Sequence, residues 1–156
     1  MALRVSTTPV ELLIDASVVA SLDQEMRSAA PRRAAGFLLG NSSGVVLSAR
    51  ALCAVRPGTD SGGGQYSSVL TSADYRRALR KARGLVLMVL ASYTTHPDGD
   101  PHVRLREIAG FRRSPLASLV VTARPNGAAP RLEAYGPPTG GAITVAVGRG
   151  ADRDPA

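Results

Sequence analysis

The sequence predicts a single α/β domain, in which a mixed central β-sheet is flanked by two or three helices. Its 156 residues have the length of one domain. The continuous apolar run 84–92 has the character of a buried central strand. Segments with helical periodicity alternate with strand-like segments on both sides of this run, as in α/β folds.

Two segments show the periodicity of amphipathic helices. In 15–30, apolar residues recur at intervals of three and four. In 71–83, Thr71 and Asp74 have the spacing of a capping box, and the following apolar residues share one face opposite a row of arginines. A third, short helix is predicted over 103–110.

The remaining regular segments read as strands bounded by glycine, proline and polar residues. We predict strands at 10–14, 36–40, 45–55, 85–92, 116–122, 131–135 and 142–147. They would form one domain over residues 1–147, followed by a flexible tail over 148–156.

Composition narrows the choice of partners and compartment. The net charge is +7, and all but Lys81 of the 19 basic residues are arginine, a skew typical of GC-rich coding. Arginines cluster in 76–83 and 104–113, which leaves a nucleic-acid-binding module as an alternative. The chain has no Trp and only two Phe, so the stacking residues of such modules are scarce and nucleic acid is disfavoured as a partner.

No apolar run approaches the ~20 residues that span a bilayer, and Cys53 has no partner for a disulfide. We expect a cytoplasmic protein with no membrane contact.

The segment 93–101 is the first candidate for a functional site. It follows the apolar run and contains His96, one of two histidines, in a polar stretch with Pro97 and Gly99. In α/β proteins, the loop that leaves a buried central strand commonly carries the chemistry.

Two segments resemble motifs of the JAB/MPN (JAMM) domain family. Segment 31–40, PRRAAGFLLG, is similar to the family pattern P-x-E-x-x-G-x-L-x-G. Segment 92–97, SYTTHP, is similar to the pattern W-Y-H-S-H-P. The resemblance covers roughly residues 5–147 and implies the JAB/MPN fold.

The resemblance also implies a zinc site, most of which is replaced in this chain. Active members use two His and one Asp as ligands, a Glu as general base and a Ser that stabilises the oxyanion. Arg33 stands at the Glu position, and Thr94 stands at the first His position. His96 keeps the second His, Arg104 replaces the Ser, and Glu107 replaces the Asp.

We therefore predict a degenerate site with no catalytic residue and no cofactor. His96 and Glu107 would be vestigial metal ligands, because one imidazole and one carboxylate do not form a three-ligand zinc site. The remaining residues of the degenerate pocket or binding loop are Arg33, Tyr93, Thr94, Thr95, Pro97 and Arg104. A rebuilt metal site that combines His96, His102, Glu107 and Asp98 or Asp100 stays open as an alternative.

The favoured hypothesis is a catalytically degenerate JAB/MPN-like protein that acts as a protein-binding or scaffold module. The resemblance implies a ubiquitin-like or sulfur-carrier-like protein, or a catalytic JAMM paralogue, as the partner. It also leaves a homodimer open, since family members commonly pair through helices. The alternative from the same family is a zinc-dependent isopeptidase or metallopeptidase with an unorthodox site.

Overall fold

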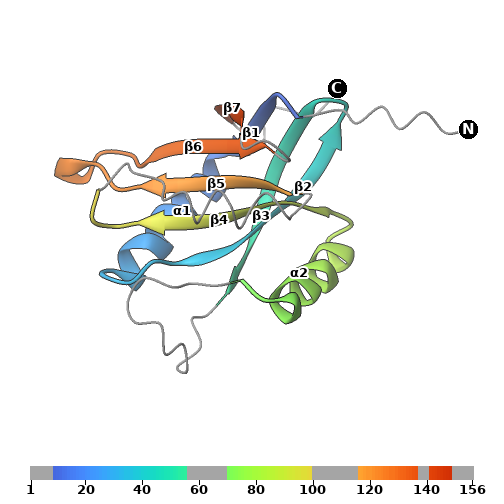
Figure 1. The fold of residues 1–156 in the computed structure, drawn as a ribbon, viewed down its shortest axis with the longest axis horizontal. Helices are drawn as coiled ribbons and strands as arrows, with labels where there is room; N and C mark the ends of the chain where they lie inside the picture. Colours follow the sequence, from blue (N-terminus) through green and yellow to red (C-terminus); the bar gives the residue numbers. More distant parts are fainter. Residues whose placement is uncertain (1–8, 56–69, 100–115, 137–140, 149–156) are drawn as a thin grey trace, which may run out of the picture.

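In the computed structural model, seven strands close into one barrel (Figure 1). The structure describes residues 9–55, 70–99, 116–136 and 141–148. Along the chain the elements are β1 (Glu11–Asp15), α1 (Ala16–Ala29), β2 (Ala35–Ser43), β3 (Val46–Val55), α2 (Ser72–Gly84), β4 (Met88–His96), β5 (Ala117–Thr122), the 3-10 turn η2 (Pro125–Gly127), β6 (Arg131–Gly136) and β7 (Gly141–Gly148). Neighbours around the barrel follow the order β1-β3-β2-β4-β5-β6-β7.

The prediction of a central sheet flanked by two or three helices is wrong. The barrel closes because β1 pairs in parallel with β3 on one side and with β7 on the other, Glu11 lying opposite both Val46 and Thr144. The strands therefore form a closed wall around one interior, rather than an open central sheet with two faces for helices to cover. The described residues form two α-helices, and the short helix predicted over 103–110 lies outside them. So does the tail beyond residue 148.

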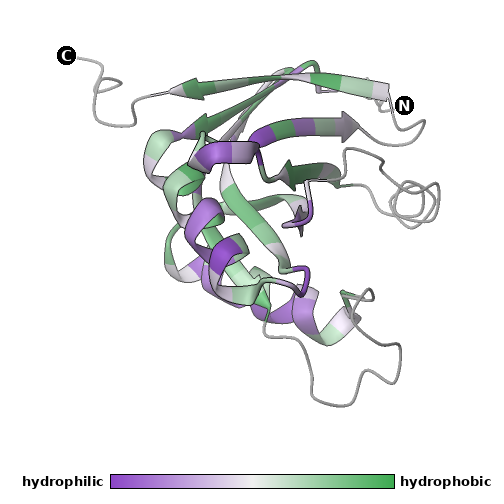
Figure 2. Ribbon diagram, turned by 90° about the vertical axis from the view of Figure 1, so that its left-hand side faces the viewer, coloured by the Kyte–Doolittle hydropathy of each residue, from purple (hydrophilic) through white to green (hydrophobic). Residues whose placement is uncertain are grey.

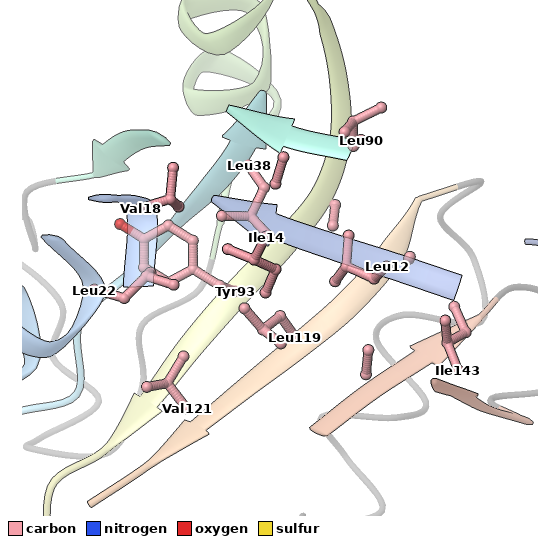
Figure 3. Close-up of a cluster of buried hydrophobic side chains, with 14 of the residues drawn as sticks. Leu12, Ile14, Val18, Leu22, Leu38, Leu90, Tyr93, Leu119, Val121 and Ile143 are labelled. Atoms are coloured by element: carbon pink, nitrogen blue, oxygen red, sulfur yellow. The ribbon is translucent and has the colours of Figure 1, made fainter. Parts of the chain in front are cut away.

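The barrel interior is one apolar core to which every strand contributes, and α1 adds Val18, Leu22 and Met26 to it. Figure 3 shows Val18 and Leu22 of this helix beside the Tyr93 ring. Alternate residues of a strand point to opposite faces, so a strand supplies about every second side chain to this interior, apart from the irregularity in β4 where Leu90 and Ala91 both belong to it. The largest fully buried members include Leu12, Ile14, Leu38, Tyr93 and Leu119.

A second apolar cluster lies on the outer face of the barrel, where α2 packs against β2, β3 and β4. Ala78 and Ala82 of the helix lie buried with Phe37 and Cys53. The Phe37 ring also contacts Tyr75, with ring centroids 5.9 Å apart. The opposite face of α2 is polar, with exposed arginines at positions 76, 77, 80 and 83, and helical turns with purple residues are visible in Figure 2.

The capping box predicted for α2 is confirmed. The Thr71 side chain accepts a hydrogen bond from the Asp74 backbone N–H (3.2 Å), and the Asp74 carboxylate accepts one from the Thr71 N–H (2.9 Å). This reciprocal pair satisfies two backbone donors that the first turn leaves without helical partners. Within the part of the chain that the structure describes, no helix is both long and apolar enough to cross a bilayer.

Two glycines of segment 31–40 are required by close packing in the barrel wall. A Cβ at Gly36 would lie 2.6 Å from the Tyr93 hydroxyl oxygen and would clash with the Cys53 carbonyl oxygen. A Cβ at Gly40 would clash with the backbone of Ser48 and lie 2.9 Å from the Leu90 side chain. The G-x-L-x-G spacing is therefore a consequence of how β2 packs against its neighbours.

Candidate functional site on the outer face of the barrel

The structure places the segment around Arg33 directly beside the end of β4. The Thr95 N–H donates to the Ala34 carbonyl oxygen (2.9 Å), and the Ala34 N–H donates to Thr95 Oγ1 (2.7 Å). The antiparallel register pairs Ala35 with Thr94. Arg33 precedes Ala34 and His96 follows Thr95 in the chain, so the two hydrogen bonds hold the segments that carry them side by side. These segments hold the positions that correspond to the family's general base and its second His.

Alternation along β4 divides the predicted site residues between two faces. The Tyr93 side chain lies in the barrel interior beside α1 (Figure 3), and its hydroxyl donates to Glu25 Oε2 at 2.6 Å. Burial and the Glu25 hydrogen bond raise the pKa of Tyr93. Thr94 and His96 are on the opposite, outer face, because side chains alternate along a strand. Tyr93, which the sequence groups with the pocket, is thus part of the core and of the contact with α1.

His96 is the last residue of β4 and is fully buried. Its carbonyl oxygen accepts hydrogen bonds from the backbone N–H groups of Gly99 (3.3 Å) and Ala123 (3.1 Å). Gly99 has a φ of +75°, and the half-buried Pro97 follows His96 in the same turn. The expectation that the polar loop begins at residue 93 is corrected: the strand continues through His96 and the turn starts there.

A row of buried polar side chains runs across β4 and β5 on this outer face. Ser92 is paired in register with Ser118, and His96 with Thr122. The members of the row are Ser92, Thr94, His96, Ser118 and Thr122, all under 9% exposed. Within the described residues, the hydroxyl oxygens of Thr94 and Ser118 have no hydrogen-bond partner. Buried polar atoms are normally hydrogen-bonded, so these two hydroxyl groups are unusual for the interior of a protein.

The polar row continues onto β6 as a small charged network. Glu133 accepts a hydrogen bond from the Tyr135 hydroxyl (2.8 Å) and pairs with Arg131 Nε (2.6 Å). Burial, followed by the Glu133 hydrogen bond, raises the pKa of Tyr135. Sequence reasoning missed this extension, along with Ser118 and Thr122. Polar residues recur at even spacing among apolar ones in the sequences of β5 and β6, which is the feature that could have indicated a polar face. Only the pairing of β5 with β4, and of β6 with β5, shows that this face lies beside His96.

The residues described at this place do not fit a catalytic zinc. They offer the His96 imidazole, the neutral Thr94 hydroxyl and the guanidinium group of the buried Arg33. A catalytic zinc requires three ligands from imidazole, thiolate or carboxylate groups. In the described ranges, no group of three His, Cys, Asp or Glu side chains is placed to hold a metal ion. The predicted site residues Arg104 and Glu107, and the alternatives His102 and Asp100, lie outside these ranges.

Solved structures with the same fold come from several prokaryotes. A Desulfitobacterium hafniense protein aligns with a TM-score of 0.73 and 15% identity, over 88% of this chain and 93% of that one. A Salinibacter ruber protein aligns with a TM-score of 0.61 and 20% identity, over 92% and 94%. A JAB1/MPN domain protein from Archaeoglobus fulgidus aligns with a TM-score of 0.56 and 13% identity, over 88% and 98%.

Comparison of the sequence alone finds no related family or protein. No model of a known protein family matches the chain, and no curated protein sequence matches it. The three structural likenesses, all at 20% identity or less, establish the fold. The chain has a JAB/MPN-like fold.

Proposed function

We propose that this protein is a catalytically inactive JAB/MPN-like domain that binds a protein partner. One observation supports the proposal: two hydrogen bonds between Ala34 and Thr95 hold the segment of the buried Arg33 beside the end of β4, which carries Thr94 and His96. In the family pattern, Arg33 stands at the position of the general base, and Thr94 and His96 stand at the positions of the first and second zinc-binding His. The fold is retained, and the groups needed for hydrolysis are replaced.

The replacements oppose the chemistry in a specific way. A guanidinium group stays protonated at neutral pH, so Arg33 cannot accept a proton from water. Its positive charge opposes binding of a dication in the same buried region, where electrostatic interactions are weakly screened. The Thr94 hydroxyl is neutral and ligates zinc poorly. The apolar interior of the barrel does not depend on these side chains, which is why the fold tolerates their loss.

The partner is expected to be another protein. The resemblance to the JAB/MPN family favours a ubiquitin-like or sulfur-carrier-like protein, or a catalytic JAMM paralogue, and includes a second copy of this chain. A net charge of +7 favours the acidic members of this set, since complementary charge speeds association and excludes wrong partners. The function would then be scaffolding: binding the partner without cleaving it.

The proposal is tested by measuring binding and cleavage in the same sample. The purified chain is titrated with ubiquitin-like proteins, sulfur-carrier-like proteins and JAMM paralogues from its own source organism, each carrying a short C-terminal extension. We expect binding that a chelator does not change, and an intact extension with or without added zinc. His96→Ala serves as the control and leaves binding unchanged. Cleavage that requires zinc, is blocked by the chelator and is lost in His96→Ala would establish the alternative, a zinc-dependent peptidase.

A further inference from the structure

Helix α2 ends in a turn that holds a valine in the left-handed backbone conformation. The Val86 N–H donates to the Arg83 carbonyl oxygen (3.1 Å), and the Leu87 N–H donates to the Ala82 carbonyl oxygen (2.8 Å). These two bonds are those of a Schellman motif, in which the residue at the position of Val86 is usually glycine. Val86 has a φ of +57°. A β-branched side chain is strongly disfavoured there.

No packing within the described residues compensates for this strain. Val86 is 87% exposed, and its neighbours Leu85 and Met88 are 49% and 54% exposed. Glycine at position 86 would form the same turn without strain and without an apolar side chain in water. Backbone strain that the fold itself does not require is typical of functional positions. We call Leu85, Val86 and Met88 the apolar tip.

The apolar tip is bordered by positive charge. Arginines on the solvent-exposed face of α2 lead up to it: Arg76, Arg77, Arg80 and Arg83. Lys81 differs, because its ammonium group donates to the Leu52 carbonyl oxygen (2.8 Å) and is directed to β3. A small apolar centre with an arginine border matches the composition of protein interfaces, where arginine pairs with carboxylates in a bidentate geometry.

We propose that the apolar tip inserts into a hydrophobic pocket on an acidic protein, while the α2 arginines pair with carboxylates around that pocket. This inference rests on the proposed protein-binding function and gives it a surface and a partner chemistry. A membrane is the less suitable occupant, because segments that enter the lipid interface usually anchor there through aromatic side chains, and the tip has none. Nucleic acid accounts for the arginines but gives the strained valine no role.

The surface is mapped by photocrosslinking in the source cells. A photoreactive benzoylphenylalanine is placed at position 86 or 88, and at position 147 as a control, since Val147 is 55% exposed and lies on β7. We expect a protein adduct from positions 86 and 88 and none from 147, with an acidic protein identified in it by mass spectrometry. Phospholipid or nucleic acid in the adduct, or no adduct at either tip position, would overturn the inference.

The crosslinked protein is then produced and its affinity measured against matched variants. Val86→Gly is expected to weaken binding about tenfold or more, while raising the melting temperature because the strain is removed. Val147→Gly leaves the affinity unchanged. Arg80→Gln weakens binding most at low salt, since the contact is electrostatic. Unchanged affinity in Val86→Gly would contradict the inference.

Different results would contradict the inactive protein-binding domain and the docking role of the apolar tip. A protein adduct from position 147 alone would show that the chain binds a protein through another surface, which contradicts the apolar tip and keeps the binding function. Zinc-dependent cleavage of the crosslinked protein would contradict the inactive site and keep the tip as the docking surface.

Discussion

The hydroxyl of Tyr93 donates a 2.6 Å hydrogen bond to Glu25 and so joins the barrel interior to helix α1. The phenol is fully buried and the carboxylate is half-buried. Each group therefore depends on the other for a hydrogen bond that water cannot readily replace. We predict that Tyr93→Phe lowers the free energy of unfolding by about 1.5–3 kcal/mol, the usual range for a hydrogen bond to a charged group. Chemical denaturation followed by circular dichroism measures it. An unchanged midpoint would show that the bond adds nothing to stability.

The same pair predicts a pH dependence of stability. Desolvation by burial raises the pKa of Glu25, and the Tyr93 hydrogen bond partly opposes this. Because the folded-state pKa lies above the unfolded one, the folded state binds more protons between the two values. The Glu25 contribution to stability is therefore most favourable below the unfolded pKa, and it decreases as pH rises through the folded pKa.

Glu25→Gln removes this titration and keeps an oxygen that accepts the Tyr93 hydrogen bond. We predict that the melting temperature of the variant, relative to the natural chain, increases from about pH 4 to about pH 8. Asp23→Asn on the same helix, whose carboxylate pairs at the surface with Arg27, controls for the change of net charge. A relative melting temperature that does not change with pH, or that falls, would contradict the prediction.

Glycines 40 and 84 are predicted to respond in opposite directions to the same substitution. A Cβ at Gly40 meets the Ser48 backbone, which cannot move without disturbing the barrel, whereas a Cβ at Gly84 meets nothing within 4 Å. We expect Gly40→Ala to cost more than about 3 kcal/mol, and Gly84→Ala to be neutral or stabilising by about 0.5–1 kcal/mol because α2 loses a flexible residue. Thermal unfolding of both variants decides this, and a mild effect at Gly40 would refute the packing role.

The capping box of α2 gives a separate prediction for stability. Thr71→Ala removes the oxygen that accepts from the Asp74 N–H, at a cost of about 1 kcal/mol. Ser72→Ala, at the next position, is the control and should have little effect. Equal destabilisation by the two variants would mean that the cap contributes nothing specific.

Much of the local structure could be predicted from the sequence, because local chemistry determines it. The capping box at Thr71 and Asp74, the helical periodicity of 15–30 and the strand-like runs all appear in the structure near their predicted positions. Barrel closure could not be predicted, because it depends on β1 pairing with β3 and β7, which lie far from it in the sequence. A strand's own residues do not show which neighbours it pairs with.

The neighbourhood of the candidate site could be predicted in part from the sequence, and the roles given to its residues stay predictions. The juxtaposition of the Arg33 and His96 segments follows from the family resemblance, and the structure places them side by side. The polar side chains from residue 94 onward favour an end of the strand before Tyr93. The structure extends β4 to His96, and alternation along this longer strand then directs the Tyr93 side chain to the interior. The polar residues of β5 and β6 became part of the site only through their register with β4.

A measurement of bound zinc tests the inactive site most directly. The natural chain, His96→Ala and the double variant Arg33→Glu/Thr94→His are purified without chelators, and the zinc content of each is measured by elemental mass spectrometry. We predict far less than one zinc per natural chain, no difference in His96→Ala, and a gain of bound zinc in the double variant, which restores a carboxylate and a second imidazole. One zinc per natural chain, lost in His96→Ala, would contradict the inactive site.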